Sequence, residues 1–340
     1  MSVSATPRIA IIGAGLAGLT CATALKGMAG VTVFEKSVFV GGRVSRHPFG
    51  EYRDHSGEQY ITVSNPLFLK IVESWLDAGL LRPWEGWVVE LNHGQIVNLD
   101  DLTPRYRGAP NMQAIADRLA SGLDLRHSTS VAELDRGDDG SWRLFDDRGG
   151  YLGVYDLVVI ATSADQVPGL ARAAPSIARA AANIDMTLCW SALFDFETSL
   201  NLPFEAAFVL DSPLSWVARL DAPQPYPERE CWVVHASPEW SAQYAASFRG
   251  RVLHALMDAF FEACDQPPRK PLASNVHCWR HALPINTLGE DCLFDERASI
   301  GACGDWCTAP RIEGAVLSGF SMADRVMKQL RKREHGRAAG

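Results

Sequence analysis

The feature that most constrains this chain is a glycine motif near its start, Gly13-x-Gly15-x-x-Gly18, placed where an apolar run ends and a helical pattern begins. The first glycine permits a tight turn, the second lets the backbone approach a pyrophosphate, and the third lets helix and strand pack closely. The N-terminus of the helix then presents free N–H groups and its positive dipole end to the phosphates. The motif therefore predicts a dinucleotide-binding βαβ unit.

Two further features narrow the choice of dinucleotide. Glu35 ends the second apolar run, where a carboxylate can accept hydrogen bonds from ribose hydroxyls, but it does not separate NAD from FAD. Gly41-Gly42-Arg43 then supplies two more glycines and a cation for the pyrophosphate. The alternative is an ordinary turn with a solvated arginine. The ordered set is similar to that of the flavin-dependent amine-oxidase superfamily and favours FAD.

A late segment supplies a second set of candidate contacts. Gly304-Asp305-Trp306 follows an apolar run, and Arg311-Ile312-Glu313-Gly314-Ala315 comes next. An acid at the end of such a strand can bind a ribityl hydroxyl. A helix that starts near Glu313 would direct its positive end at the flavin edge that becomes negative on reduction. The alternative is that these residues form an ordinary capped C-terminal helix with no role in cofactor binding.

Other residues are candidates for the flavin ring and the substrate. Gln59 and Tyr60 should follow the Gly41-Gly42-Arg43 loop toward the ring. Val131, in an expected strand over 128–134, could pair with the adenine through its backbone, or could be plain core. A strand over 274–283 would place three rings on one face, either toward a flat substrate or simply packed. They belong to His277, Trp279 and His281.

These readings give one set of predicted sites. The predicted catalytic residues are Tyr60, His277, Trp279 and His281. No metal site is predicted, because no carboxylate or cysteine is spaced to complete one. The predicted cofactor contacts are Gly13, Gly15, Leu16, Ala17, Gly18, Glu35, Lys36, Gly42, Arg43, Glu58, Gln59, Tyr60, Val131, Thr162, Gly304, Asp305, Glu313, Gly314 and Ala315.

The hydrophobic pattern predicts an α/β fold in which a dinucleotide-binding domain is assembled from separated segments. Apolar runs over 8–12, 31–34, 155–161 and 298–303 read as buried strands of one parallel sheet, with a helix over 16–28. A hairpin over 84–99 and strands over 187–196, 214–220, 231–236 and 274–283 predict a second, mixed sheet. The expected FAD domain spans 1–70, 105–170 and 295–333. The expected substrate domain spans 71–104 and 171–294, and 334–340 form a flexible tail.

The composition of the chain limits the classes of partner that it is expected to bind. The chain has 340 residues, of which 47% are hydrophobic and 21% charged, so two compact domains can each bury a core. A net charge of −8 argues against nucleic acid or an anionic membrane as a partner. Eight cysteines without a CxxC pair predict free thiols in a reducing cytoplasm, although a redox pair of Cys303 and Cys307 is an alternative. The first residues show no signal-peptide pattern.

Taken together, these segments resemble the renalase family, particularly its bacterial members. The resemblance runs over nearly the whole chain. It is carried by the motifs above together with 59–62, 208–216, 232–240 and the segments Cys303-Gly304-Asp305-Trp306-Cys307 and Arg311-x-Glu313-Gly314-Ala315.

The resemblance implies a fold like p-hydroxybenzoate hydroxylase, with FAD bound non-covalently. It also implies a reaction: isomeric dihydronicotinamide dinucleotides, reduced at ring positions 2 or 6, give hydride to flavin N5. Electrons then pass to O2, which leaves NAD(P)+ and hydrogen peroxide.

Two departures from the family pattern affect the substrate. Renalases usually have Tyr-Ala after His-x-Trp, and here the segment is His281-Ala282. The family's Gly-Ala-Gln-Tyr reads Gly57-Glu58-Gln59-Tyr60, with His55 where an acid is common.

Alternatives to this reading stay open. Amine oxidases often use a lysine near the flavin, and no lysine lies between Lys70 and Lys270. A carotenoid-type or porphyrinogen oxidase would need a larger apolar tunnel. A flavin- or dinucleotide-binding sensor would hold cofactor without turnover, and a covalent flavin would need Cys278 or Cys303. Sequence leaves the oligomeric state, the choice between NAD and NADP, and the electron acceptor undecided.

Overall fold

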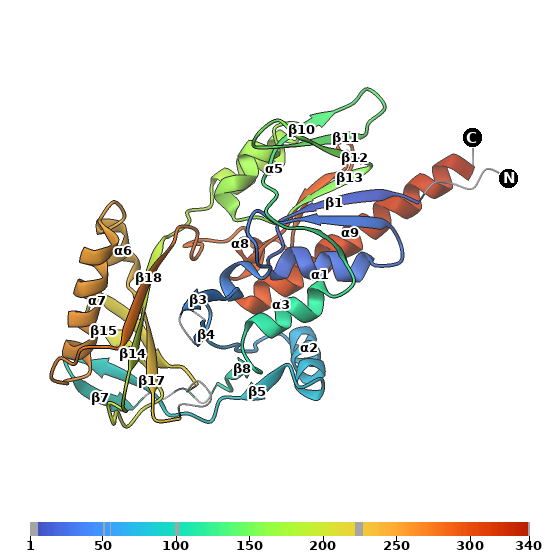
Figure 1. Cartoon of the computed structure of the whole chain (residues 1–340). Coiled ribbons are helices and arrows are strands. Elements are labelled where there is room, and N and C mark those ends of the chain that lie inside the picture. Colours follow the sequence, from blue (N-terminus) through green and yellow to red (C-terminus); the bar gives the residue numbers. More distant parts are fainter. Residues whose placement is uncertain are drawn as a thin grey trace.

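The computed structural model describes residues 6–49, 52–54, 56–98, 101, 103–221 and 227–338. These residues form two halves, seen side by side in Figure 1, each built on its own sheet. His55 and Leu99, the last residue of the expected hairpin, lie outside the described ranges.

The first sheet is parallel through its centre, in the order β19-β20-β13-β1-β2-β9. Only the edge strand β19 (Leu293–Asp295) runs antiparallel to its neighbour. The parallel strands are β1 (Arg8–Ile12), β2 (Gly30–Phe34), β9 (Asp124–Arg126), β13 (Leu157–Ile160) and β20 (Ile300–Ala302). The expected parallel sheet of separated segments is therefore confirmed, although β13 and β20 are shorter than the expected strands.

Strand β1 shows why these runs are apolar without alternation. Ile9 and Ile11 pack into one core, whereas Ala10 and Ile12 pack into another on the opposite face. A strand covered on both faces has no solvent side, so every position is apolar.

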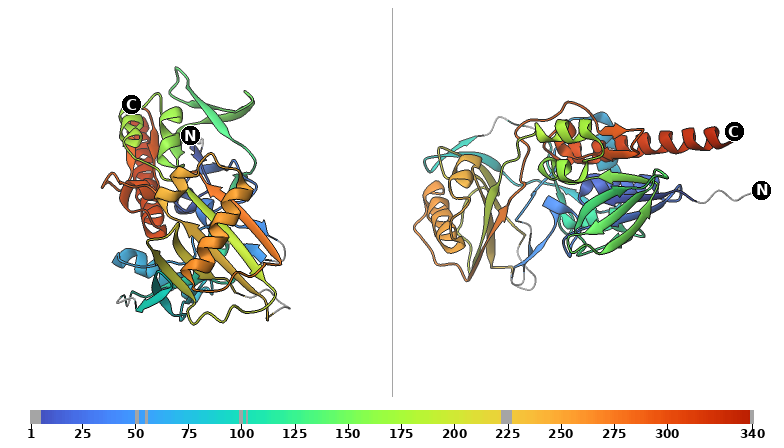
Figure 2. Two further views of the ribbon diagram at one scale, coloured as in Figure 1. Left: turned by 90° about the vertical axis from the view of Figure 1, so that its left-hand side faces the viewer. Right: turned by 90° about the horizontal axis from the view of Figure 1, so that it is seen from above.

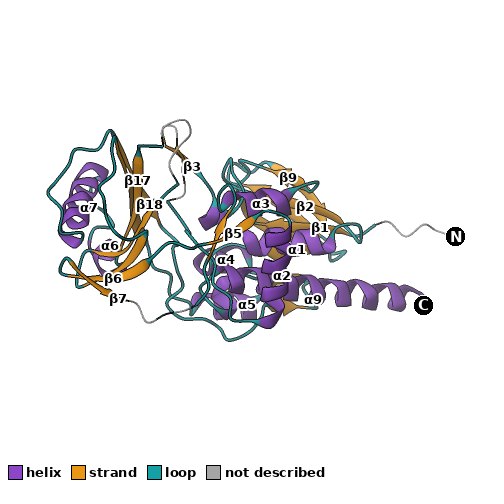
Figure 3. Cartoon of the chain, turned by 90° about the horizontal axis from the view of Figure 1, so that it is seen from below, coloured by secondary structure: helices purple, strands orange, loops and turns teal. Residues whose placement is uncertain are grey.

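Helices cover one face of this sheet, and helices with a small sheet cover the other. The first layer holds α1 (Leu16–Leu25), α2 (Pro66–Asp77), α3 (Gln113–Ala120) and α9 (Ile312–Ala338). The second holds α4 (Val167–Leu170), α5 (Pro175–Ala182) and the three-stranded sheet β10 (Val131–Arg136), β11 (Trp142–Asp146) and β12 (Tyr151–Tyr155). The view from below in Figure 3 shows α9 extending away from the second half.

The second sheet is mixed and has seven strands in the order β18-β14-β17-β16-β15-β6-β7. β6 pairs parallel with β15, and the other neighbours are antiparallel. The strands are β6 (Val88–Asn92), β7 (Gln95–Asn98), β14 (Cys189–Phe196), β15 (Ala206–Leu210), β16 (Leu214–Arg219), β17 (Glu230–Ala236) and β18 (Ala273–Trp279). The expected mixed sheet and its β6–β7 hairpin are confirmed.

One face of the second sheet is closed by two helices, α6 (Pro238–Gln243) and α7 (Arg249–Ala263). Ser237 caps α6 by accepting a hydrogen bond from the Trp240 backbone N–H, as its position before Pro238 suggests. The other face is turned toward the first half, as the two views of Figure 2 show.

The expected strand over 274–283 is too long. β18 ends at Trp279, and Arg280 and His281 form a turn. In continued register Thr187 would oppose His281, but it exchanges hydrogen bonds with Ala282 and Leu283 instead, at 2.8 Å each. This irregularity breaks the alternation, so His281 does not extend the row of His277 and Trp279.

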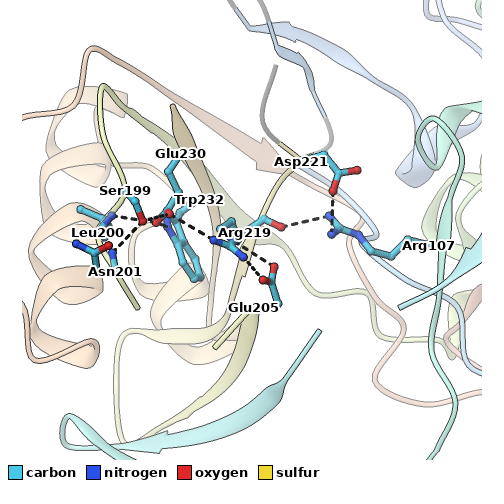
Figure 4. A network of polar contacts seen from close by, with 9 residues as sticks. All are labelled: Arg107, Ser199, Leu200, Asn201, Glu205, Arg219, Asp221, Glu230 and Trp232. Atoms are coloured by element: carbon cyan, nitrogen blue, oxygen red, sulfur yellow. Dashed lines mark hydrogen bonds and ion pairs between the residues drawn. The ribbon is translucent and has the colours of Figure 1, made fainter. Parts of the chain in front are cut away.

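A network of charges links the two halves (Figure 4). Arg107, on β8 (Tyr106–Gly108), donates to the Arg219 carbonyl at 3.2 Å and lies 3.5 Å from the Asp221 carboxylate. Arg219 in turn pairs with Glu205 and lies 3.5 Å from Glu230. Short β8 also pairs with β5 (Leu81–Pro83), so this strand pair runs beside the joint between the halves.

The cores place two helices differently from the expected domain boundaries. Residues of α2 are buried in the core under the first sheet, and α5 packs on its other face. Helix α9 continues to Ala338 through most of the expected tail. No described helix combines the length and apolar character that a membrane crossing requires.

We predict that Phe260→Ala destabilises the second half. Phe260 is fully buried and contacts Phe194, Phe196, Trp232 and Phe261. Truncating such a ring leaves a cavity and should cost about 3–5 kcal/mol in the free energy of unfolding, measured by urea denaturation. Phe248→Ala, at a ring 80% exposed, is the matched control. Equal small effects in both variants would contradict the assigned core.

Candidate cofactor site

The turn between β1 and α1 leaves room for a ligand at one glycine and for nothing at the other two. Gly13 has φ +104°, and a Cβ there would lie 2.6 Å from the Ala161 carbonyl oxygen. A Cβ on Gly18 would lie 2.0 Å from the Gly13 oxygen. Around Gly15 nothing lies within 4 Å of a built Cβ. No described side chain caps α1, so its first N–H groups face the open space beside Gly15.

Glu35 is fixed at the end of β2 by its own backbone neighbours. Its carboxylate is buried and accepts hydrogen bonds from the N–H groups of Ala14 and Ser37, both at 2.9 Å. Each carboxylate oxygen has a further lone pair to offer. The side chain is therefore oriented to accept hydroxyl donors from a ligand lying along the turn.

Arg43 and Asp305 join distant parts of the chain across this site. Two left-handed glycines, Gly41 and Gly42, turn the chain into the short helix η1 (Gly42–Val44) that carries Arg43. The guanidinium contacts both Asp305 oxygens, at 2.6 and 2.7 Å, and donates to the Ala282 carbonyl at 2.8 Å. Burial opposes the charge of Arg43, but Asp305 and then Glu58 outweigh it and raise the pKa of the guanidinium.

A cavity of about 920 Å³ connects these groups. That volume lies near the top of the roughly 300–1,000 Å³ range of ligand sites. One end is lined by residues around Glu35 and β10, the middle by the glycine turn, Thr162 and the Arg43–Asp305 pair, and the far end by Glu58 and 277–281. The cavity therefore runs from the nucleotide turn to the second sheet.

Most of the predicted contacts line this cavity. From the cofactor set they are Gly13, Gly15, Leu16, Ala17, Glu35, Lys36, Gly42, Arg43, Glu58, Val131, Thr162, Gly304, Asp305 and Ala315, and from the catalytic set His277, Trp279 and His281. The chain thus brings residues from both halves to one cavity.

The remaining predicted residues lie beside the cavity lining rather than in it. Gly18 and Gly314 are packing positions, since a Cβ on Gly314 would lie 2.1 Å from the Ala309 oxygen. Gln59 is buried and donates to the Gly57 carbonyl at 2.9 Å. The ring of Tyr60 packs between Trp84 and Trp216, with centroids at 5.7 and 5.4 Å.

Glu313 forms hydrogen bonds with the segment that precedes α2. Its carboxylate accepts from the N–H groups of Ser64 and Asn65, at 2.7 and 2.9 Å, and from the Ser64 hydroxyl. Burial would raise the pKa of Glu313, but these hydrogen bonds outweigh it and lower the pKa. Glu313 thereby ties the start of α2 to the N-terminus of α9, while its neighbours Ile312 and Ala315 line the cavity.

A single backbone carbonyl anchors the far end of the cavity. Three strands of the second sheet direct polar atoms at the Ser56 oxygen: Ser191 Oγ at 2.8 Å, His235 Nε2 at 2.8 Å and Trp279 Nε1 at 3.1 Å. Beside it, a Cβ on Gly57 would lie 1.9 Å from the Arg43 oxygen. The segment is thus held between the sheet and the Arg43 turn.

His277 and Trp279 share one face of β18, and their rings meet edge to face with centroids 4.6 Å apart. His281 lies in the following turn, with Nδ1 2.7 Å from Asp165 Oδ2 at an angle that makes no hydrogen bond. The three rings reach the same cavity even though His281 is not on the strand.

Sequence reasoning did not identify Ser191 or His235, because nothing in their local sequence marks them. Their role follows from the register of β14, β17 and β18, which aligns them. It also left Ser37, Thr129 and Arg311 out of the predicted contacts, although they line the cavity. Proximity to Glu35, Val131 and Glu313 in the sequence was the available signal.

Among the described residues, one cysteine lines the cavity and no cluster of metal ligands is present. None of the eight cysteines takes part in a disulfide bond. Cys278 lines the cavity and Cys303 does not, and burial raises the pKa of the Cys278 thiol. No cluster of three or more potential metal ligands occurs among the residues that the structure describes.

Comparison with protein families identifies the chain. A model described as flavin containing amine oxidoreductase matches residues 76–327, and one for an NAD(P)-binding Rossmann-like domain matches residues 11–74. The chain belongs to the flavin-containing amine oxidoreductase family. It is an oxidoreductase, and its cofactor is FAD.

Solved structures confirm the fold at low sequence identity. A putative protoporphyrinogen oxidase from Exiguobacterium sp. is 13% identical with a TM-score of 0.76, covering 97% of this chain and 100% of that one. Cyclohexylamine oxidase from Brevibacterium oxydans is 14% identical with a TM-score of 0.74, covering 96% and 100%. Putrescine oxidase, in a structure with putrescine bound, is 13% identical with a TM-score of 0.74, covering 95% and 99%.

The residues present fit FAD. The open space at Gly15, the uncapped helix and the Arg43 cation suit a pyrophosphate, and Glu35 suits a ribose. Asp305 offers a buried acceptor in the middle of the cavity.

We predict that Gly15→Val and Glu35→Ala each yield largely colourless protein. The valine would fill the space open at Gly15, and the alanine would remove the acceptor near the ribose. FAD content is measured by absorbance after purification, with circular dichroism to confirm folding. Gly169→Val, at a glycine with equally open surroundings but outside the cavity, is the control. Full FAD loading of both site variants would show that the nucleotide site is misplaced.

We further predict that His235 makes the protein less stable in mild acid. Burial lowers the pKa of His235 from 6.5 to about 4, although the Ser56 carbonyl favours the protonated ring. Between those values the unfolded chain binds the proton and the folded chain does not, so stability falls as the pH drops from 7 toward 4.

The expected loss from this residue is about 1–3 kcal/mol in the free energy of unfolding. His235→Gln keeps a donor for Ser56 without a titrating ring, so its stability should fall less over this range. His254→Gln, at an exposed position on α7, should behave as wild type. An unchanged pH dependence in His235→Gln would contradict the prediction.

Proposed function

We propose that this protein is a renalase-like FAD oxidase that converts 2- or 6-dihydro-NAD(P) to NAD(P)+. The observation that carries the proposal is the far end of the cavity, where the paired rings of His277 and Trp279 border the space next to the Arg43–Asp305 pair. Stacked or edge-on rings suit a flat heteroaromatic ligand. The described lining contains one lysine, Lys36, which lies beside Glu35 at the opposite end.

The proposed oxidation requires the protein mainly to position the dihydronicotinamide ring. A dihydronicotinamide becomes aromatic when it loses hydride, so no strong base has to remove a proton. FAD, when bound, would supply the acceptor for the hydride, and its reoxidation by O2 would take up one proton and release hydrogen peroxide. The contribution of the chain is to hold the ring in reach and exclude water, which His277, Trp279 and the anchored Ser56 segment are placed to do.

An amine oxidase is the second candidate, and family membership favours it. The amine would need its carbon–hydrogen bond oriented in the same cavity, with Glu58 as the nearby carboxyl for a cationic group. A non-catalytic flavin or dinucleotide sensor is the third, and it would show no reduction by any donor. We place the protein in the cytoplasm, with FAD held non-covalently.

The deciding measurement is anaerobic mixing of the FAD-loaded protein with 6-dihydro-NAD, followed by the absorbance of oxidised flavin. We expect rapid bleaching, recovery of colour on admission of air, and formation of peroxide. NADH itself, reduced at position 4, is the matched donor control. Bleaching by primary amines but not by dihydronicotinamides would establish the amine oxidase, and no bleaching by either would favour the sensor.

A further inference from the structure

Glu58 is a carboxyl fixed at the far end of the cavity by its backbone. Its N–H donates to the Arg43 carbonyl at 3.1 Å. The residues before it are held in place, since the Ser56 oxygen meets three side chains and Gly57 has no room for a Cβ. The side chain of Glu58 therefore starts from a rigid position and reaches the cavity that Trp279 also lines.

The surrounding charges leave this carboxyl without a dedicated partner. Arg43 directs its terminal nitrogens at Asp305 and the Ala282 carbonyl, so the nearest cation is largely engaged. Among the described residues, none donates a hydrogen bond to the Glu58 carboxylate, and no ion pair involves it. Because Asp305 neutralises Arg43, an ionised Glu58 adds a negative charge to this end, and no hydrogen bond or ion pair of the described residues compensates it.

Other titratable and charged groups surround Glu58 besides Arg43 and Asp305. Tyr60 and the Cys189 thiol lie near it, and both have a pKa raised mainly by burial, so they are neutral. His277 and His281 line the same cavity. Arg280 and Arg311 also line it, at exposed positions where water screens their charges.

We infer that Glu58 is a specificity-determining residue whose carboxylate favours donors that become positively charged rings on oxidation. The inference rests on the proposed function. When hydride leaves a neutral dihydronicotinamide, one carbon–hydrogen bond breaks, two electrons go to the flavin, and the ring is left as a cation with no proton released. A fixed carboxylate beside that ring stabilises the charge as it develops.

This role depends on pH in a defined direction. Burial, and then the charge of Asp305, raise the pKa of Glu58 despite the opposing effect of Arg43. Below its pKa the carboxyl is neutral and offers no preference for a cation. The preference should therefore strengthen as the pH rises through the titration of Glu58.

The test is a binding comparison that does not require turnover. The FAD-loaded protein is titrated with 1-methylnicotinamide, a cation, and with 3-methylbenzamide, its neutral isostere, by calorimetry at several pH values. We expect the cation to bind about tenfold tighter at the highest pH and the advantage to shrink in acid. Glu58→Gln should abolish the advantage at every pH, and Glu58→Asp should retain part of it. Glu73→Gln, at an exposed carboxylate on α2, should match wild type.

The outcomes separate this inference from the proposed function. Equal binding of the two probes by wild type at all pH values overturns the role of Glu58, even if 6-dihydro-NAD bleaches the flavin. A pH-dependent preference without bleaching keeps the role of Glu58 and overturns the substrate. Should Glu58→Gln fail to hold FAD, the pH dependence in wild type and in Glu58→Asp still decides the question.

Discussion

The ion pair between Arg43 and Asp305 is the interaction on which the arrangement of the site depends. It joins the turn after the first dinucleotide motif to the start of α8 (Asp305–Thr308), and its third contact reaches Ala282 at the exit of the second sheet. Asp305 is 3% exposed, so loss of Arg43 would leave a buried charge without its partner. Breaking such a pair typically costs about 3–5 kcal/mol. The pair therefore fixes where the two halves meet and where the cavity runs.

The Ser56 carbonyl provides the complementary attachment on the side of the second sheet. The lowered pKa of His235 leaves its ring neutral near pH 7, with a single proton. Because a carbonyl only accepts hydrogen bonds, that proton must lie on Nε2, which faces the Ser56 oxygen. Three adjacent strands thus hold one loop, and the loop carries Glu58 into the cavity. The flavin site is common to the family, as its description indicates. A rigid carboxyl beside two paired aromatic rings can distinguish one substrate from another, which the flavin site by itself cannot.

The sequence predicted those parts of the site that depend on neighbouring residues better than those that depend on contacts between distant segments. The Gly13–Gly18 motif, Glu35 and Arg43 are local features, and the structure brings them to one cavity. His277 and Trp279 reach it as alternation along β18 predicts, whereas the strand ends before His281 because Thr187 pairs with Ala282 and Leu283. Tyr60 packs between two tryptophans that lie far along the chain, and no local pattern indicates such a contact.

The sequence by itself determined the βαβ unit, the parallel core of the first sheet and the identity of the cofactor, because turn geometry, strand burial and phosphate binding depend on residues close together in the chain. Only the tertiary structure decided that Glu313 fastens α2 to α9 and that Ser191 and His235 anchor Ser56. Those contacts join segments that are more than a hundred residues apart, so their geometry is set by the packing of the two sheets.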